Sequence, residues 1–213
     1  MRRLALAPLL LLAVLAAGCG AGPTTTQSRD VAPFDRIEVR GSIDVEVVPG
    51  GASGVKVIAG ENVIDRVATE SSDGVLRLSI RDHGIVIGPD PYDDARVQVS
   101  ADALQGLRVL GSSDVGLGEI DADELSIEVE GSGDVDARGT VGNLIATIQG
   151  SGDADLAGLE ARTATVSVQG SGDVSVNVAD SLDVTVQGSG DVSYRGRPRV
   201  SQSVSGSGEI HAD

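Results

Sequence analysis

Gly131-Ser132-Gly133-Asp134-Val135 is one of six closely similar phrases that decide the fold of this chain. The other copies span residues 111–115, 150–154, 170–174, 188–192 and 206–210. Successive copies start 20, 19, 20, 18 and 18 residues apart. A fixed period of this size indicates supersecondary units that stack on one another, because each unit is too small to bury a core alone.

Apolar and polar residues alternate on both sides of each phrase, which is typical of strands with one face inward. Glycine suits the corner between two such strands because it accepts positive φ. The sequence therefore predicts an all-β fold, a parallel β-helix or solenoid with about 18–20 residues per rung and two strands around each corner. We expect Val135, Ala154, Val174 and Val192 to lie in a single inward file.

Composition and charge agree with a slim, exposed solenoid. One Phe, two Tyr and no Trp leave the core to aliphatic side chains, as a narrow cross-section requires. The formal net charge is −16, and loss of Arg2 and Arg3 with a leader leaves 14 basic against 32 acidic residues, or −18. Such a surface repels phosphate backbones, so we expect no binding of nucleic acid.

Residues 1–19 have the pattern of a lipoprotein signal peptide, with two arginines before an apolar core that is short for a membrane span. Leu15-Ala16-Ala17-Gly18-Cys19 resembles a bacterial lipobox, with Ala16 where leucine is usual. The resemblance implies lipidation of Cys19 and attachment to the cell envelope; an ordinary secretory signal is the alternative. Cys19 is the only cysteine, so an intramolecular disulfide is impossible. Residues 20–33 are predicted to be a flexible tether.

Residues 34–105 form a second β-rich part, which we expect to cap the repeat β-helix of residues 106–213 or to continue into it. Gly41-Ser42-Ile43-Asp44-Val45 is a degenerate first copy of the repeated phrase. A short helical turn is expected within residues 61–67 and an exposed loop over 88–94. Strands are predicted over residues 36–40, 43–48, 55–59, 75–80, 85–87 and 96–100.

Three segments before the repeats resemble a known family: Phe34-Asp35-Arg36-Ile37-Glu38-Val39, Gly60-Glu61-Asn62-Val63-Ile64 and Asp73-Gly74-Val75-Leu76-Arg77-Leu78. Together with the repeated phrase they resemble the bacterial DUF2807 family, also described as the "putative auto-transporter adhesin, head GIN domain". The resemblance covers about residues 34–213. It implies an exported, β-helical protein of the cell envelope, and it brings no catalytic residues with it.

The repeated acidic residue is the clearest candidate for chemistry. Its copies form one column, Asp114, Asp134, Asp153, Asp173 and Asp191, which Glu209 closes. One interpretation is that each carboxylate accepts hydrogen bonds from nearby backbone N–H groups at the corner. The other is a line of weak Ca²⁺ sites, because hard cations bind carboxylate and carbonyl oxygens. A second column, Gln149, Gln169 and Gln187, is predicted to form an amide ladder between rungs, with a sugar-binding strip as the alternative.

Signs of catalysis are weak. His83 and His211 are the only histidines, and both are expected to be solvated. The sequence contains neither a G-x-S-x-G elbow nor an H-E-x-x-H motif. Three arginines follow the repeated phrase in separate rungs: Arg138, Arg162 and Arg195. We interpret their distances from the phrase along the sequence as unequal, so they predict no catalytic cluster. We expect no enzyme activity and no cofactor apart from the candidate Ca²⁺.

These observations favour a lipid-anchored envelope protein that binds or scaffolds through a repetitive surface. The expected partners are the membrane, through Cys19, and a glycan or surface protein. A carbohydrate-active enzyme on the same fold is one alternative. End-to-end assembly is another, because open β-helix ends carry unpaired edges. Gln202 and the polar ending His211-Ala212-Asp213 favour a capping rung instead.

Overall fold

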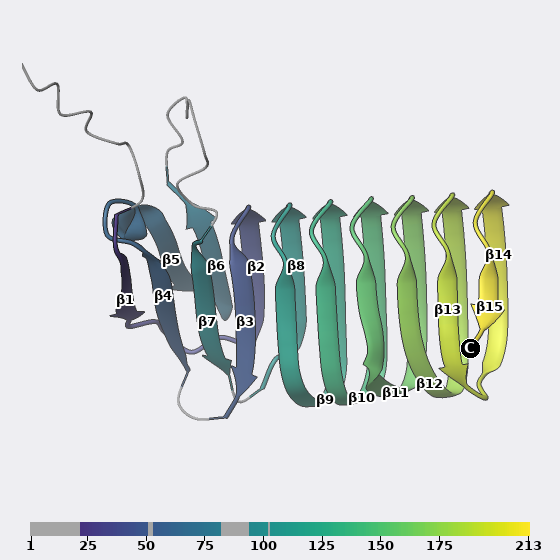
Figure 1. Ribbon diagram of the computed structural model, residues 1–213. Helices are drawn as coiled ribbons and strands as arrows, with labels where there is room; N and C mark the ends of the chain where they lie inside the picture. Colours follow the sequence, from purple (N-terminus) through teal and green to yellow (C-terminus); the bar gives the residue numbers. More distant parts are fainter. Residues whose placement is uncertain (1–21, 51–52, 82–93, 102) are drawn as a thin grey trace, which may run out of the picture.

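The protein is a parallel β-solenoid of about five turns, as the repeats predict (Figure 1). The structure is a computed structural model that describes residues 22–50, 53–81, 94–101 and 103–213. Cys19 and His83 lie outside these residues, as do the strand expected over 85–87 and most of the loop expected over 88–94. The described residues contain no helix long and apolar enough to span a bilayer.

Each full rung of the repeat region is one long, bent strand. β9 (Val115–Gly131), β10 (Val135–Gly150), β11 (Ala154–Gly170) and β12 (Val174–Gly188) each run from one Gly-Ser-Gly corner, or its Gly-Ser-Ser variant, to the next. The prediction of two separate strands per rung is therefore wrong. The two expected strands are joined by a rounded bend that keeps its pairing with the neighbouring rungs, and small register shifts there, as between Asp136 and Arg138, absorb the unequal rung lengths.

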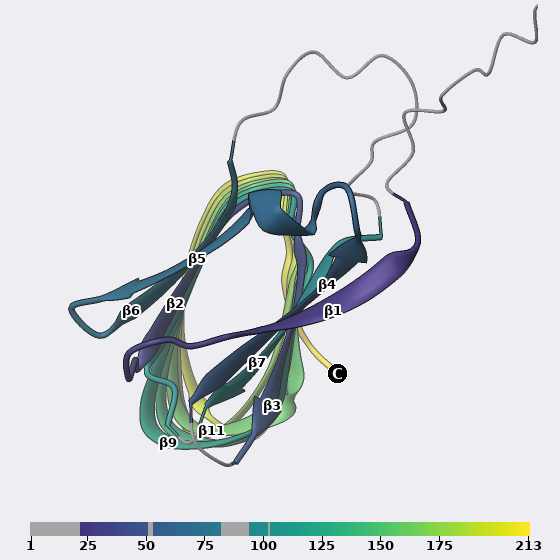
Figure 2. The ribbon, with the colours of Figure 1, turned by 90° about the vertical axis from the view of Figure 1, so that its left-hand side faces the viewer.

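The bent strands build two walls. The halves that follow the corners form the first wall, with β3 (Asp44–Pro49) on one side and β13 (Val192–Gly196) and β15 (Ile210–Ala212) on the other. The halves that precede the corners form the second wall, with β2 (Arg36–Gly41), β8 (Gly106–Gly111) and β14 (Arg199–Gly206). Seen along the axis in Figure 2, the rungs superpose as a single ring.

The predicted inward file exists. Val135 pairs with Ala154, Ala154 with Val174, and Val174 with Val192, and each of these four side chains is at most 2% exposed. The file extends backwards through Val115 to Val45, which confirms that residues 41–45 are a first copy of the repeated phrase. Because the period places equal side chains over one another, the core is one continuous column of aliphatic groups.

The N-terminal part closes one end of the stack. β6 (Val75–Ile80) and β7 (Arg96–Ala101) run parallel to the rungs, and β5 (Val67–Ser72) and β4 (Gly54–Gly60) then pair with them antiparallel. The expected helical turn is a 3₁₀ helix, η1 (Ile64–Arg66), whose Ile64 is buried. The N-terminal part was expected either to cap the stack or to continue into it, and it does both.

β1 (Thr24–Arg29) corrects the expectation of a flexible tether over residues 20–33 for the part that the structure describes, which begins at residue 22. It pairs antiparallel with β4 along its whole length, from Thr24 opposite Gly60 to Arg29 opposite Val55. The physical reason is that β4 would otherwise leave a free edge, and the threonines of β1 favour an extended backbone. β5 was likewise not among the predicted strands.

Candidate functional site

The aspartate column is a hydrogen-bond ladder that links successive corners. Each Oδ1 accepts a hydrogen bond from the backbone N–H of the acidic residue one rung later. The distances are 3.1 Å from Asp134 N to Asp114, 2.8 Å from Asp153 N to Asp134, 2.8 Å from Asp173 N to Asp153, 2.8 Å from Asp191 N to Asp173 and 2.7 Å from Glu209 N to Asp191. This confirms the hydrogen-bonding interpretation, except that the partner N–H lies in the next corner and not in the same one.

The calcium interpretation of the same column stays a prediction. One oxygen of each carboxylate already accepts a hydrogen bond of the ladder, which leaves the second oxygen outside the ladder. Within residues 22–50, 53–81, 94–101 and 103–213, no three His, Cys, Asp or Glu side chains are grouped so as to hold a metal ion. A Ca²⁺ ion usually takes six to eight oxygen ligands, so water would have to supply many of them.

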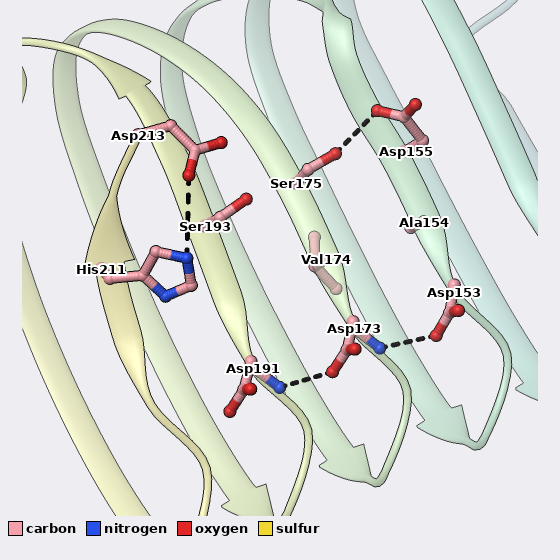
Figure 3. Close-up of a pocket in the computed structure, with 10 residues that line it drawn as sticks. All are labelled: Asp153, Ala154, Asp155, Asp173, Val174, Ser175, Asp191, Ser193, His211 and Asp213. Carbon is pink, nitrogen blue, oxygen red and sulfur yellow. Dashed lines mark hydrogen bonds and ion pairs between the residues drawn. The ribbon is translucent and has the colours of Figure 1, made fainter.

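Beside the ladder, the first wall carries an open hollow of about 300 Å³ near its C-terminal end (Figure 3). The residues that follow the corners in β11, β12, β13 and β15 place their outward side chains there, because alternate residues of a strand face the same side. The hollow is lined by Asp153, Ala154, Asp155, Asp173, Val174, Ser175, Asp191, Ser193, His211 and Asp213. It is strongly acidic, with His211 as the one side chain in the lining that can carry positive charge.

A second hollow of about 480 Å³ adjoins the first and shares Asp155 and Ser175 with it. Its other lining residues are Asp136, Ala137, Arg138, Ala157, Gly158 and Arg195. Gly158 makes room for a neighbour, since a Cβ there would lie 2.9 Å from Cγ of Arg138. We call the two together the paired hollows.

The arginines of the second hollow correct the sequence analysis. Arg138 and Arg195 both lie seven residues after the first glycine of their rung, so their offsets are equal, whereas Arg162 lies twelve residues after its own. The structure brings Arg138 and Arg195 into one hollow and leaves Arg162 exposed outside it. Alignment of the repeats at this position would have revealed the pair.

Asp155, which lies in both of the paired hollows, accepts two hydrogen bonds from its own wall. Ser175 Oγ donates a hydrogen bond of 2.7 Å to its Oδ1, and the backbone N–H of Ala157 donates one of 3.2 Å. The Ser175 hydrogen bond is the main cause that lowers the pKa of Asp155; partial burial opposes it, and the Ala157 N–H and the charges of Arg195 and Arg138 lower the pKa further. Asp155 is therefore held as a carboxylate that accepts hydrogen bonds.

His211 lies in the first hollow, with Nε2 3.7 Å from Oδ1 of Asp213. Its side chain is 53% exposed, which agrees with the expectation of a solvated histidine. No local sequence pattern indicates that His211 shares a hollow with Asp153, Asp173 and Asp191.

The predicted amide ladder is not formed. Gln149, Gln169 and Gln187 stack in register on the second wall and are exposed. Among the described side chains, however, no hydrogen bond joins one of these amides to another, so the prediction is wrong on that point. Exposure explains the difference, because water satisfies these amides as well as a neighbouring amide would.

Comparisons with known proteins agree with the architecture. A family described as "Putative auto-transporter adhesin, head GIN domain" matches residues 33–198. The chain is 24% identical to a solved putative adhesin from Bacteroides fragilis, with 90% of this chain and 97% of that chain covered and a TM-score of 0.73.

Two solved proteins of Parabacteroides distasonis are also similar. One is described as a putative adhesin and is 21% identical, with 91% of this chain and 98% of that chain covered and a TM-score of 0.57. The other is described as a putative lipid binding protein and is 21% identical, with the same shares covered and a TM-score of 0.53. Likeness at these identities shows a shared fold. No curated protein matches the chain.

Proposed function

The chain belongs to the DUF2807 family, and we propose that it is a non-catalytic, adhesin-like binding module of the bacterial cell envelope. The family description and the adhesins among the similar structures support an adhesin-like role. The observation that carries the proposal is the pair of adjoining hollows on the first wall, where carboxylates, hydroxyls and two arginines face solvent together.

The chemistry of the paired hollows suits a neutral ligand rich in hydroxyl groups, such as a glycan. Carboxylates such as Asp155 accept hydrogen bonds from hydroxyls, and Arg138 and Arg195 donate hydrogen bonds to hydroxyl or carbonyl oxygens. Because successive rungs repeat the ladder carboxylate, a long ligand can make the same weak contact several times along the axis.

The lowered pKa of Asp155 suits this carboxylate to accept hydrogen bonds and argues against a role as a general acid. A general acid that protonates a leaving group needs a raised pKa, so that it still carries its proton near neutral pH. The pKa of Asp155 is lowered, and the hydrogen bonds that lower it come from its own wall. The carboxylate is thus prepared to accept hydrogen bonds from a ligand and is poorly suited to donate a proton.

We further propose that Cys19 is lipidated and anchors the chain to the envelope. Two features support this: the lipobox-like residues 15–19, and the position of β1 at one end of the solenoid (Figure 1). An anchor that precedes β1 would let the stacked rungs extend away from the membrane. Replacement of Cys19 by Ser should move the chain from the membrane fraction to the soluble fraction and abolish metabolic labelling with a radioactive fatty acid. Unchanged labelling would contradict the anchor.

The binding proposal is tested by retention on a glycan array and on intact cells. We expect Asp155→Asn and Arg195→Gln each to reduce retention by roughly tenfold, the effect of losing about 1.4 kcal/mol of charge-assisted hydrogen bonding. Asp183→Asn is the matched control, because Asp183 is an exposed aspartate on the second wall. Equal retention of all three variants would remove the paired hollows as the site. Release of a shortened glycan would replace the binding role by an enzymatic one.

A further inference from the structure

Among the described residues, nothing stacks on the outer side of the last rung, which contains β14 (Arg199–Gly206); we call this side the open end. All eight residues of β14 are exposed. Val200 and Val204 are 37% and 42% exposed, and among the described residues they are the large hydrophobic side chains that stand out in this way. Their partners one rung earlier, Leu182 and Val186, are 1% and 0% exposed. Val200 and Val204 thus occupy core positions without a rung above them, so Gln202 between them does not make this rung a complete cap.

The other end of the molecule exposes no large hydrophobic side chain among the described residues, although β1 and β5 each keep one edge unpaired there. β1, β4, β5 and η1 are all placed there (Figure 2), and η1 buries Ile64. A head-to-tail contact would have to fit the open end of one copy against this capped end of another. The asymmetry favours a contact between two open ends.

The open end also carries unpaired strand edges. β14 pairs with β12 on one side, and β15 pairs with β13 on one side, and the described chain places no strand against their other edges. A free edge is a template for another strand. We propose that β14 pairs antiparallel with β14 of a second copy of this chain, so that two solenoids join tail to tail about a two-fold axis.

The sequence of β14 is self-complementary in one register. With the axis at Gln202, Val200 of one copy lies opposite Val204 of the other, and the two Gln202 residues face each other. Directly opposed residues of an antiparallel pair point to the same side. Both valines would therefore be covered on the inward side, with the two Gln202 amides facing each other between them, while Ser201 and Ser203 would pair on the outer side. The valines would extend the aliphatic core up to this central amide pair from both copies.

Charge favours the same arrangement. The antiparallel register sets Arg199 of one copy opposite Ser205 of the other, next to the corner that ends in Glu209. Arg197 and Arg199 are exposed, and within the described chain they take part in none of the ion pairs that occupy Arg36, Arg40 and Arg108. Both arginines are thus available to the acidic corner of a second copy. An isologous contact of this kind closes after two copies and gives no filament.

The tail-to-tail pairing names a second copy of this chain as a partner. The biological role of that pairing rests on the proposed function. If Cys19 anchors one end of each solenoid, the open end points away from the membrane. Tail-to-tail pairing would then join copies on two facing envelopes, which is adhesion between like cells. The contact itself does not depend on the anchor, so the two can fail separately.

The register is tested by a disulfide on the two-fold axis. Directly opposed residues of antiparallel strands have Cα atoms about 4.5–5.5 Å apart, within the range that a disulfide spans. In the full-length chain, Gln202→Cys should form a covalent dimer under mild oxidation at least tenfold faster than Gln187→Cys, an exposed glutamine in an inner rung of the same wall. The unsubstituted chain, with Cys19 as its only cysteine, measures the background. Equal rates for the two variants would overturn the proposal.

Sedimentation of the full-length chain in detergent tests the apolar contact. We expect a reversible monomer–dimer equilibrium, and because one strand edge and two valines make a small interface, a protein concentration of about 100 μM or more should be needed to populate the dimer. Val204→Asp should shift the equilibrium to monomer, at least tenfold in dissociation constant, while the monomer keeps the circular dichroism spectrum of a folded β protein, because Val204 is already 42% exposed in the single chain. Growth beyond a dimer, or dimers unaffected by Val204→Asp, would overturn the proposal. Glycan retention by Val204→Asp should stay unchanged, which separates this contact from the paired hollows.

Discussion

At the scale of single residues, the two glycines of a Gly-Ser-Gly corner share one requirement and differ in another. Gly150 adopts φ 135°, which L side chains rarely do, so a glycine is predictable here from the turn of the chain at the corner. Gly152 has an ordinary φ, but a Cβ there would lie 2.1 Å from the carbonyl oxygen of Gly133 in the rung below. Close approach of the backbones between rungs therefore requires the second glycine, and it applies to the first as well, since a Cβ on Gly150 would lie 2.1 Å from the carbonyl oxygen of Gly131. Such a contact between distant residues has no signature in local sequence.

Gly152→Ala should lower the free energy of unfolding by about 1–3 kcal/mol, since the backbone must shift to relieve the clash with Gly133. Gly116→Ala is the matched control on the first wall, because a Cβ there meets only the flexible carboxylate of Asp136 at 3.2 Å. That control should be neutral or slightly stabilising. Urea denaturation measures both. A loss at Gly116 as large as the loss at Gly152 would contradict the close-approach explanation.

Asp44 precedes the aspartate column by one rung, and its pKa predicts how the stability of the protein depends on pH. Burial is the main cause that raises its pKa, followed by the charge of Asp114; Arg96 and a hydrogen bond from the Asp114 backbone oppose the rise. A raised pKa means that the ionised group costs stability at neutral pH, and that the cost disappears below the ordinary carboxyl pKa of about 3.9. Asp44→Asn should therefore stabilise the protein at pH 7, by up to about 0.5 kcal/mol because Asp44 is largely solvated, and have no effect near pH 3.

Ser175→Ala should change the stability at pH 7 in the opposite direction to Asp44→Asn. The pKa of Asp155 is lowered mainly by the Ser175 hydrogen bond, so this contribution to stability is present above the ordinary carboxyl pKa and is lost as pH falls through the lowered folded value. Ser175→Ala should then destabilise at pH 7 and lose its effect in acid. Thermal unfolding at the two pH values distinguishes the variants. Parallel pH profiles for Asp44→Asn and Ser175→Ala would contradict both assignments.

At the scale of elements, the sequence predicts the strands that repeat with the period. It does not predict the strands that occur once and pair with a single distant partner. The inward file from Val115 to Val192 follows from period alone, because equal spacing stacks equal residues. β1 and β5 occur once each, and their antiparallel partners leave no mark in the local pattern. The aspartate ladder was predictable in kind, since turn aspartates accept backbone hydrogen bonds. The paired hollows were not, because they depend on where Ala157 and Gly158 turn at the bend.

β1 should protect the edge of β4 from solvent. Thr26 lies opposite Ile58, and proline at this position removes a backbone N–H and restricts φ. In Thr26→Pro, the β4 amides that face β1 should exchange with solvent at least about tenfold faster, while those that face β7 keep their protection. Amide hydrogen exchange followed by NMR resolves the two sets. Thr26→Val, which keeps the N–H, is the control, and unchanged exchange in Thr26→Pro would mean that β1 does not hold its place on β4.

At the scale of the whole molecule, the rungs are interchangeable in their core but not in their surface. Leu144, Ala164 and Leu182 occupy one inward position, as do Ile148, Val168 and Val186. The outward positions of the first wall change from rung to rung, and only one stretch of it carries the paired hollows. Stability is therefore expected to scale with the number of rungs, whereas binding depends on particular ones.

Removal of one whole rung tests this separation of stability from binding. Deletion of residues 151–170 joins Gly150 to Ser171 and restores the corner phrase, and it brings β10 beside β12 with Val135 over Val174 and Ile148 over Val186. We expect a folded, shorter solenoid whose denaturant m-value falls by about a tenth, because less surface is exposed on unfolding. Deletion of residues 151–160 is the control, since half a rung destroys both corner and register and should leave the chain unfolded. The full-rung deletion removes Asp155 and should lose glycan retention while it keeps its β spectrum; if it unfolds like the control, the rungs are not independent stacking units.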